Sequence, residues 1–444
     1  MRSKIPHHWK WLPFESLLSE PLRNGIYKKK EFHGRGTPII NMGELFGYPR
    51  FDGSCELKRV ELTEKELDKN QLVCGDLIFA RRSLTAEGAG KCSIIRKLSE
   101  PTGFESSIIR ARLDQTKADP EYFYYLFNSP FGKWLLGTIL RQVAVSGITG
   151  SDLAKLEVPV PPLNEQSLIA KQAISIDDKV AINTSINQSL EQMAQAIFKS
   201  WFVDFDPVKA KMNGEQPEGM DTVTASLFPE KLVESELGLI PDGWNIESIK
   251  DFGNVICGKT PSKKNADFYG GDVPFIKIPD THGKVFITET SDTLTKAGDE
   301  SQPKKRIPEN SICVSCIATV GQVFITTKPS HTNQQINSVV PYDQNSLYYL
   351  LFKFKGLNKH FHDLASGGSA TLNMNTSTFS KVALVRPTAD VLEAFHKTVG
   401  GLMEKMLANQ LENTTLSELR DTLLPKLLSG EIELGTSEEL VEAI

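Results

Sequence analysis

The sequence predicts an α+β fold in which two similar globular domains are separated by two long helices packed as an antiparallel coiled coil. Three observations support this class. An apolar pattern with helical spacing occurs twice, the segments that precede its two copies resemble each other, and net charge alternates along the chain. Repetition at this scale indicates an internal duplication of the form domain–helix–domain–helix, with a pseudo-twofold internal repeat.

The two helical patterns step by four and three positions in turn, which is the spacing of a coiled-coil seam. The second pattern lies 226 positions after the first, and a pair of asparagines recurs in both. A centred antiparallel pairing places Asn183 opposite Asn413 and Asn187 opposite Asn409. Such a polar layer fixes helix register at a cost in stability. The seams consist of Ile169, Ala173, Ile176, Val180, Asn183, Asn187, Leu190, Ala194, Ile197 and Trp201, and of Phe395, Val399, Leu402, Met406, Asn409, Asn413, Leu416, Arg420, Leu423 and Leu427.

An alternative interpretation is that each helix packs only on its own domain, because amphipathic helices are common. The repeated asparagine pair favours the coiled coil instead. We expect Asn164 and Asp390 to cap the two helices, since both follow a proline-terminated strand. We also expect Pro425 to end or kink the second helix near Leu424. Antiparallel pairing would hold the two globular domains apart by a spacer tens of ångströms long.

The composition is that of a soluble globular protein rather than of a membrane protein or a disulfide-rich secreted protein. The chain has 444 residues, 40% hydrophobic and 24% charged, which is ordinary for a soluble globular protein. We find no secretory signal and no membrane-spanning apolar run, and the six cysteines are too few for a disulfide framework, so we expect a cytoplasmic protein with reduced thiols. The total net charge of −5 divides into +5, −6, +3 and −7 for residues 1–160, 161–240, 241–386 and 387–444. Two local basic faces are therefore compatible with a mildly acidic chain.

These segments give the predicted domain boundaries. Residues 1–160 and 241–386 form two globular domains, and residues 161–203 and 387–430 follow them as spacer helices. Residues 204–240 form an acidic linker with short helices, and residues 431–444 form an acidic tail. The ends of the two domains match closely, because the strand and prolines at 153–161 recur at 379–387.

The first domain offers two groups of basic side chains. The stretch 23–35 is glycine-rich and reads as a mobile surface loop, for which phosphate contact and simple solvation are equally compatible. Residues 75–82 and 93–97 predict a β-hairpin with a basic, glycine-rich tip that suits the groove of a duplex. The candidate DNA-binding residues are Lys28, Lys29, Lys30, Arg35, Arg81, Arg82 and Lys91.

The second domain has a corresponding hairpin at 309–316 and 323–327, but its tip falls near Ser315 and Cys316 and is less basic. Its basic residues lie elsewhere. We expect Lys259, Lys263 and Lys264 to contact backbone phosphates from a Gly/Pro loop. The remaining candidates are Lys304, Lys305 and Arg306.

Two motifs in the second domain suggest other functions. Gly253 to Thr260 matches the P-loop pattern, but a P-loop needs a helix that begins at its Lys-Thr pair, and Pro261 follows instead. Cys313 and Cys316 form a lone CxxC without a second cysteine pair, so strand thiols are the better interpretation. We find no methyltransferase motif, no metal-ligand spacing among the histidines and no catalytic constellation, and we expect no cofactor and no bound metal.

Several short motifs recur in or connect the two halves. They are the repeated start around Trp9 and Trp244, Gly258-Lys-Thr-Pro261, Leu-Phe-Pro-Glu at 227–230, Ser235-Glu-Leu-Gly-Leu-Ile-Pro241, Pro161-Pro-Leu-Asn-Glu-Gln166 and Leu428-Ser-Gly-Glu-Ile432. With these motifs the chain resembles a known family, the DNA-specificity subunits of type I restriction–modification enzymes. The resemblance covers essentially the whole chain, although the first domain lacks a clear Gly-x-Thr-Pro loop.

The resemblance implies two domains that each read half of a bipartite double-stranded DNA target. It also implies that the helices bind two methyltransferase subunits, that restriction subunits join them, and that this chain itself is not an enzyme. Two alternatives remain at this stage. One is a P-loop nucleotide-binding enzyme centred on Lys259, and the other is a coiled-coil scaffold that does not bind DNA.

Overall fold

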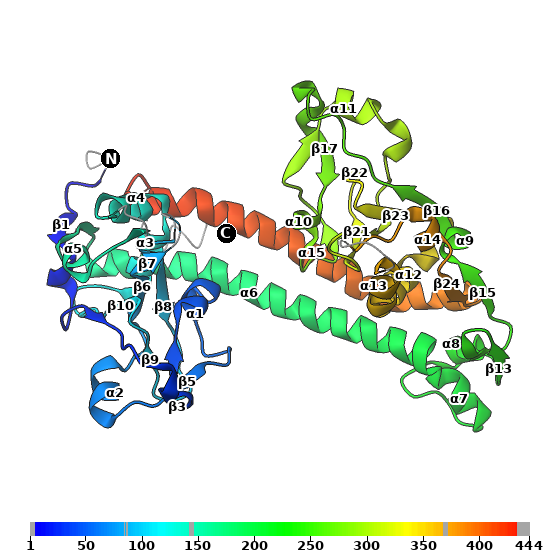
Figure 1. The fold of residues 1–444 in the computed structure, drawn as a ribbon, viewed down its shortest axis with the longest axis horizontal. Coiled ribbons are helices and arrows are strands. Elements are labelled where there is room, and N and C mark those ends of the chain that lie inside the picture. The colour runs from blue at the N-terminus through cyan, green and yellow to red at the C-terminus, as the bar shows by residue number, and fades with distance from the viewer. Residues whose placement is uncertain (1–4, 84, 86–87, 142–145, 367–371, 433–444) are drawn as a thin grey trace. The chain divides into compact units, whose positions relative to one another are not determined.

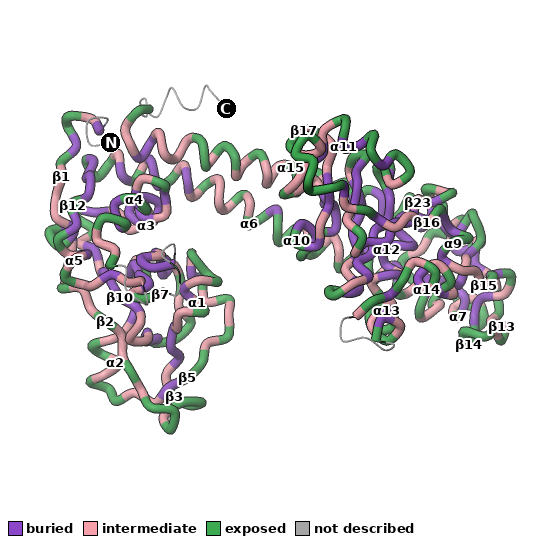
Figure 2. Tube along the Cα trace, turned by 45° about the horizontal axis from the view of Figure 1, so that its top comes forward, coloured by how far each residue is buried: buried purple, intermediate pink, exposed green. Residues whose placement is uncertain are grey.

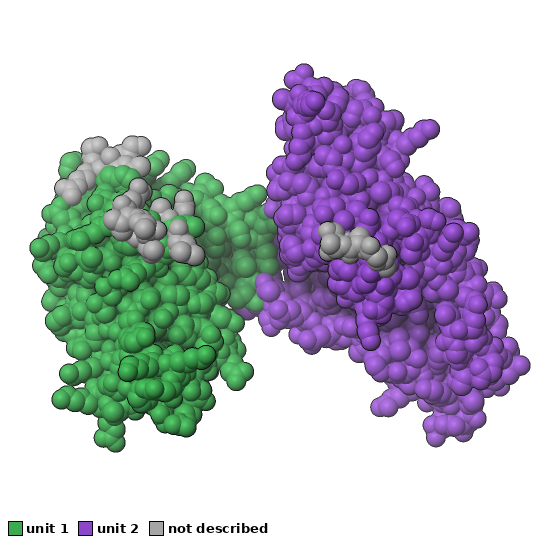
Figure 3. Space-filling view, viewed as in Figure 1, with its two compact units in different colours: residues 1–181, 413–444 green, residues 182–412 purple. Residues whose placement is uncertain are grey.

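The computed structural model describes residues 5–83, 85, 88–141, 146–366 and 372–432. Its two longest elements are helix α6 (Leu163–Lys199) and helix α15 (Ala389–Leu428). The chain divides into two compact units, Met1–Ala181 with Asn413–Ile444 and Ile182–Glu412 (Figure 3). Each unit therefore contains a stretch of both long helices, which lie side by side within it (Figure 1).

The helices are antiparallel within each unit. In the first unit Ile169 clusters with Leu427, while the Asp177 carboxylate lies 2.9 Å from the Arg420 guanidinium. In the second unit Asn409 Nδ2 donates to Asn187 Oδ1 at 2.9 Å, while the Trp201 and Phe395 rings lie 5.8 Å apart. Because residue numbers rise along one helix as they fall along the other within each unit, the predicted pair of long antiparallel helices is confirmed. Asn183 and Asn413 belong to different units, and their predicted juxtaposition stays a prediction.

The first unit has a five-stranded sheet in the order β2–β10–β6–β8–β4 and a three-stranded sheet in the order β5–β3–β9. Two further strand pairs, β1 with β12 and β7 with β11, complete it. Its strands are β1 (Lys10–Pro13), β2 (Arg23–Asn24), β3 (His33–Ile40), β4 (Arg50–Phe51), β5 (Lys58–Val60), β6 (Leu77–Ala80), β7 (Arg82–Ser83), β8 (Cys92–Ile95), β9 (Gly103–Phe104), β10 (Ile108–Ala111), β11 (Ser146–Gly147) and β12 (Glu157–Val160). Its short helices are α1 (Met42–Gly47), α2 (Glu64–Asn70), α3 (Pro120–Asn128), α4 (Pro130–Thr138) and α5 (Gly150–Lys155).

The second unit repeats these sheets, with orders β16–β23–β20–β21–β18 and β19–β17–β22. The pair β15–β24 corresponds to β1–β12, and β13–β14 is a separate hairpin. Its strands are β13 (Leu232–Ser235), β14 (Gly238–Pro241), β15 (Asn245–Ser248), β16 (Gly253–Cys257), β17 (Tyr269–Ile276), β18 (Phe286–Ile287), β19 (Asp292–Leu294), β20 (Ile312–Ser315), β21 (Val323–Thr326), β22 (His331–Thr332), β23 (Ile336–Pro341) and β24 (Ala383–Arg386). Its short helices are α7 (Asp206–Met212), α8 (Thr222–Ser226), α9 (Ile249–Phe252), α10 (Ile278–Thr281), α11 (Lys296–Glu300), α12 (Leu347–Gly356), α13 (Asn358–Ala365) and α14 (Thr376–Ser380).

Both predicted hairpins are present. Strand β6 pairs antiparallel with β8, so that Ile78 faces Ser93, and β20 pairs antiparallel with β21, so that Cys313 faces Phe324. Helices α3 and α12 are rich in Tyr, Leu and Phe, and their aromatic residues are mostly buried. Hydrophobic clusters centred on these helices and sheets form the core of each unit, as the burial colouring shows (Figure 2).

The ends of the long helices belong to these cores. In the first unit Ile169 and Ala173 of α6 join Leu427 and Leu428 of α15 in one cluster. In the second unit Ala194 and Trp201 join Phe395 and Val399. Side chains from both helices thus contribute to each core, which couples helix pairing to domain folding. Among the described residues, no helix combines the length and the apolar character needed to cross a lipid bilayer.

The expected helix caps were wrong, and so was the expectation that Pro425 ends the second helix, whereas the alternative that Pro425 kinks it stays a prediction. The caps lie earlier than Asn164 and Asp390, because Gln166 N donates to Pro162 O and Leu392 N donates to Thr388 O. Helix α15 also continues through Pro425 to Leu428. A proline so close to a helix end removes a single internal hydrogen bond, and burial of Leu427 and Leu428 in the first core stabilises the last turn.

The segment between the long first helix and the second domain is more ordered than the sequence suggested. A π-helical turn at Ser200–Asp204 extends α6, and α7 and α8 supply the expected short helices. The β13–β14 hairpin was not anticipated. The segment packs through Val208, Phe228 and Ile240 against the core of the second unit. Of the predicted acidic tail, residues 433–444 lie outside the described residues.

A polar layer interrupts the apolar seam in the second unit. Asn187 Nδ2 donates to Met406 O at 3.0 Å, and Asn183 Nδ2 donates to Glu412 Oε2 at 2.8 Å. Asn409 is 1% exposed and bonds to Asn187. Asn187 and Asn409 therefore face each other as predicted, whereas their role in fixing the register stays a prediction.

We expect Asn409→Ala to lower the free energy of unfolding by about 1–3 kcal/mol, because it removes a buried amide and leaves the amide oxygen of half-buried Asn187 without its donor. The double variant Asn187→Leu/Asn409→Leu should recover much of that loss, since an apolar pair needs no hydrogen bond. Urea unfolding followed by tryptophan fluorescence measures both. Equal stability of Asn409→Ala and the wild type would show that this contact does not stabilise the helix pair.

Candidate nucleic-acid interface

In the second unit the loop after β16 presents three of the predicted basic residues. Gly258 packs tightly, because a Cβ there would lie 2.1 Å from Asn333 O. Lys259 N donates to Thr332 O at 2.9 Å, and Tyr269 Oη donates to Pro261 O at 2.8 Å. The loop backbone is thus fixed while Lys259, Lys263 and Lys264 are exposed.

A buried network joins this loop to the second group of basic residues. His331 is 0% exposed and its Nε2 lies 2.7 Å from Asp299 Oδ1, while Asp299 Oδ2 accepts from Arg306 at 2.9 Å. Gln302 Nε2 donates to Lys259 O at 2.8 Å. Since Lys304, Lys305 and Arg306 begin two positions after Gln302, the contact from Gln302 brings both predicted groups close together.

The same geometry contradicts the P-loop interpretation. A strand does precede Gly258, but the next helical element is a 3₁₀ turn at Ala266–Phe268 rather than a helix beginning at Lys259. A P-loop cradles phosphate at a helix N-terminus, and this segment does not provide one. Lys259 therefore belongs to a rigid surface loop.

In the first unit the stretch 23–35 is not simply a mobile loop. It contains β2, a 3₁₀ turn at Lys30–Phe32 and the start of β3. Lys28 is engaged within the protein, because its Nζ lies 2.8 Å from Glu66 Oε2 and its side chain is 15% exposed. Lys29, Lys30 and Arg35 are exposed. Arg35 Nε donates to Glu61 Oε1 at 2.6 Å.

The basic hairpin of the first unit is less open than expected. Lys91 Nζ donates to Phe46 O at 3.1 Å and lies 4.8 Å from the Phe46 ring centroid. Burial, together with nearby Lys133, lowers the pKa of Lys91. Arg81 is half-buried and Arg82 is exposed on β7. Part of the predicted tip, residues 84 and 86–87, lies outside the described residues.

At the corresponding hairpin of the second unit, neutral polar groups replace the arginines. Gln322 Oε1 accepts from Thr281 at 2.6 Å, and Gln322 Nε2 lies 2.8 Å from His282 Nδ1. Sequence reasoning noted that this tip differs but did not identify Gln322. The only available signal was its position directly after Gly321 in the turn.

The CxxC thiols are buried in or beside β20, and burial raises the pKa of Cys313 and of Cys316 to about 12. Such thiols are poor nucleophiles and poor metal ligands at neutral pH. Among the described residues, no group of three or more His, Cys, Asp or Glu side chains could hold a metal ion. Strand thiols are thus the interpretation that the structure favours.

The family model described as "Type I restriction modification DNA specificity domain" matches residues 18–192 and 241–413, one copy in each half of the chain. The chain belongs to this family. It is a specificity subunit of a type I restriction–modification system, the non-catalytic component that recognises the DNA target and assembles with modification and restriction subunits.

Individual proteins similar to this chain are described as specificity subunits as well. The HindI specificity subunit of Haemophilus influenzae is 47% identical over 325 residues, which are 64% of this chain and 71% of that protein. The MjaIX specificity subunit of Methanocaldococcus jannaschii is 27% identical over 415 residues, or 92% of this chain and 89% of the relative. The crystal structure of a type I S subunit from M. genitalium aligns with TM-score 0.58 and 16% identity over 95% of this chain and 96% of that chain, which supports the fold.

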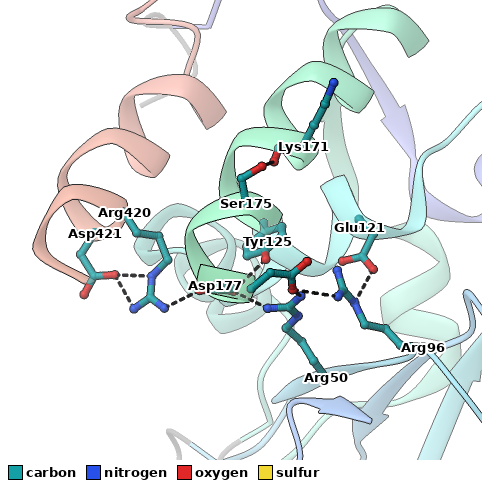
Figure 4. A network of polar contacts seen from close by, with 10 residues as sticks. Arg50, Arg96, Glu121, Tyr125, Lys171, Ser175, Asp177, Arg420 and Asp421 are labelled. Atoms are coloured by element: carbon teal, nitrogen blue, oxygen red, sulfur yellow. Dashed lines mark hydrogen bonds and ion pairs between the residues drawn. The ribbon is translucent and has the colours of Figure 1, made fainter. Parts of the chain in front are cut away.

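An ionic network fixes the first recognition domain to the long helices of this specificity subunit (Figure 4). Asp177 of α6 accepts from Arg420 of α15 at 2.9 Å and from Tyr125 Oη of α3 at 2.7 Å, and Arg50 Nη1 lies 3.3 Å from it. Asp178 Oδ1 lies 2.5 Å from Arg50 Nη2. Arg420, which breaks the predicted seam, therefore has an electrostatic partner. Sequence patterns could not reveal this network because its members come from distant segments.

We expect Asp177→Ala to destabilise the first unit by about 1–3 kcal/mol, because it leaves partly buried Arg50 and Arg420 without their shared partner. Asp421→Ala is the matched control, because Asp421 also pairs with Arg420 but is 69% exposed. An exposed pair contributes about 0–1 kcal/mol. Thermal unfolding of the full chain measures both changes, and equal effects of the two variants would contradict this account.

Proposed function

We propose that each unit reads one half of a bipartite target and that the two sets of basic residues contact the two half-sites. The observation that carries this proposal is the duplicated arrangement of a five-stranded and a three-stranded sheet with different exposed side chains on each copy. A common scaffold with different polar groups suits two domains that recognise different bases. The distance between the domains stays a prediction.

The basic residues divide by their environment. Exposed Lys29, Lys30, Lys263 and Lys264 suit phosphate contacts, which position a protein on DNA without reading sequence. Lys28 and Lys91 already have partners within the protein and are weaker candidates. The scaffold alternative without DNA binding does not account for membership in a DNA-specificity family.

We further propose that two modification subunits bind the paired long helices, in the cytoplasm where both would meet chromosomal DNA. The pseudo-symmetric repeat of α6 and α15 offers two equivalent binding faces, which supports a stoichiometry of two. On α6, Ile182, Ile186 and Met193 are 55%, 39% and 54% exposed. Their spacing puts them on one helix face, and an exposed apolar stripe is typical of a protein interface. The sequence analysis placed partner binding on the helices but did not identify this stripe.

DNA binding provides the first test. In the complex with its modification subunits, Lys259→Ala/Lys263→Ala/Lys264→Ala should weaken binding to every DNA sequence and reduce the slope of log K against log salt by roughly 2–3, about 0.9 per lost phosphate contact. Lys231→Ala is the control, because Lys231 is 66% exposed and pairs with Asp242 in the connector. Fluorescence anisotropy at several salt concentrations measures the slope. An unchanged slope would remove these lysines from the interface.

Partner binding provides the second test. Ile186→Asp/Met193→Asp should remove the modification subunit that contacts α6 and lower the mass of the complex by one subunit in size-exclusion chromatography with light scattering, because it places two carboxylates in the proposed apolar contact. Val223→Asp in the connector is the control, since Val223 is 74% exposed outside the long helices. Intact complex formation by the double variant would place the docking face elsewhere.

A further inference from the structure

The three-stranded sheets of the two units share an irregularity at the same place. In the first, Val60 of β5 pairs with both His33 and Thr37 of β3, so the register skips residues 34–36. In the second, Leu294 of β19 pairs with both Tyr269 and Val273 of β17, so the register skips residues 270–272. Each bulge thus contains three residues on the homologous strand. Bulges of this kind redirect side chains away from the sheet.

Glycines fix the backbone of both bulges. Gly34 and Gly36 have φ of 98° and 90°, and Gly270 has φ of 87°. These values lie in the region that L side chains rarely adopt. Gly271 is fixed by packing instead, because a Cβ there would lie 2.5 Å from Thr295 Cα. The non-glycine residues of the bulges are therefore Arg35 in the first unit and Asp272 in the second.

The residue directly before each bulge anchors the preceding basic segment. A ring nitrogen of His33 lies 3.1 Å from Lys28 O, and Tyr269 Oη donates to Pro261 O at 2.8 Å. Two different side chains thus make the same kind of contact at equivalent positions. As a result, each bulge stands beside exposed lysines, Lys29 and Lys30 in one unit and Lys263 and Lys264 in the other.

The bulge tips differ in chemistry. Arg35 is 74% exposed and its Nε donates to the Glu61 carboxylate, which is 40% exposed, at 2.6 Å. Exposed ion pairs of this kind contribute little to stability, so a base edge can replace Glu61 as the partner of Arg35. Asp272 is also exposed. An arginine fork matches the O6 and N7 acceptors of guanine, whereas a carboxylate accepts from the N4 amino group of cytosine.

We propose that the two bulges are the base-reading elements of their domains, with Arg35 recognising a guanine in one half-site and Asp272 a cytosine in the other. This proposal rests on the proposed reading of a bipartite target by the two units. The β3–β5 and β17–β19 ribbons would enter the major groove, which admits a two-stranded β-ribbon, while the adjacent lysines contact the phosphates. The scaffold is common to the two domains, and the single charged bulge residue distinguishes them.

Mapping the methylated bases in DNA modified by the complete complex tests the proposal. Arg35→Lys keeps the charge but loses the bidentate fork. It should relax the requirement for one guanine in one half-site by about 10- to 100-fold and leave the other half-site unchanged. Asp272→Asn should relax a cytosine requirement in the opposite half-site only. Lys29→Ala, in the same basic segment as Arg35, is the control and should weaken modification of all sites without changing the motif.

The outcomes separate this proposal from the function on which it rests. A bipartite wild-type motif that Arg35→Lys and Asp272→Asn both leave unaltered would overturn the bulge assignment and keep the proposed function. Relaxation of several positions at once, or in both half-sites, would also overturn it, because that pattern reports a loss of domain structure. A wild-type motif without two separated parts would instead contradict the proposed function itself.

Discussion

The antiparallel contact between α6 and α15 is the interaction on which the rest of the structure depends. Neither globular core is complete without side chains from both helices. In the first unit Ile169 packs in one cluster with Leu427 and Leu428. In the second unit Trp201 packs against Phe395, and the centroids of the two rings lie 5.8 Å apart. Helix pairing and domain folding are therefore coupled, and a shift in helix register would disturb both cores.

The same contact shows how stability and specificity are divided along the helices. Apolar side chains at the ends provide burial, whereas Asn187 and Asn409 in the second unit provide a directional contact that an alternative register would lose. The first unit uses charge for a comparable purpose, since Asp177 accepts hydrogen bonds from α15 and from α3. Met403 occupies the position that repeats Asp177 in the second unit and is fully buried there. The two copies thus use different chemistry at equivalent positions.

Much of the architecture could be predicted because it rests on local periodicity. The heptad spacing predicted the long helices, and short apolar runs separated by glycine-containing turns predicted the β6–β8 and β20–β21 hairpins. The failures concern places where tertiary contacts override local signals. Pro425 does not end α15, because the buried leucines after it stabilise another turn. Glycines around Arg35 were interpreted as a loop, since composition alone cannot distinguish a loop from a bulged strand.

The candidate site was harder to predict than the fold. A sequence shows its basic residues but not the partners that they have in the fold. Lys28 and Lys91 were therefore predicted to bind DNA on the same grounds as Lys30. In the structure, however, Lys28 pairs with Glu66 and Lys91 donates to Phe46 O. The contact from Gln302 to Lys259 O, which unites two basic segments, spans 43 positions and leaves no periodic trace. Asp272 was overlooked because a search for DNA contacts favours positive charge, although bases also present hydrogen-bond donors.

The first unit is discontinuous in sequence, and this affects its synthesis. Its core contains Ile5 and Trp9 from the beginning of the chain and Leu427 and Leu428 from near the end of the described region. On a ribosome, the unit that begins to emerge first is therefore the last to be completed. The second unit, Ile182–Glu412, is contiguous and can assemble while translation continues. A prematurely terminated chain would keep an unfinished apolar surface at its amino-terminal domain, which marks it for chaperones and proteases before it can compete with intact subunits.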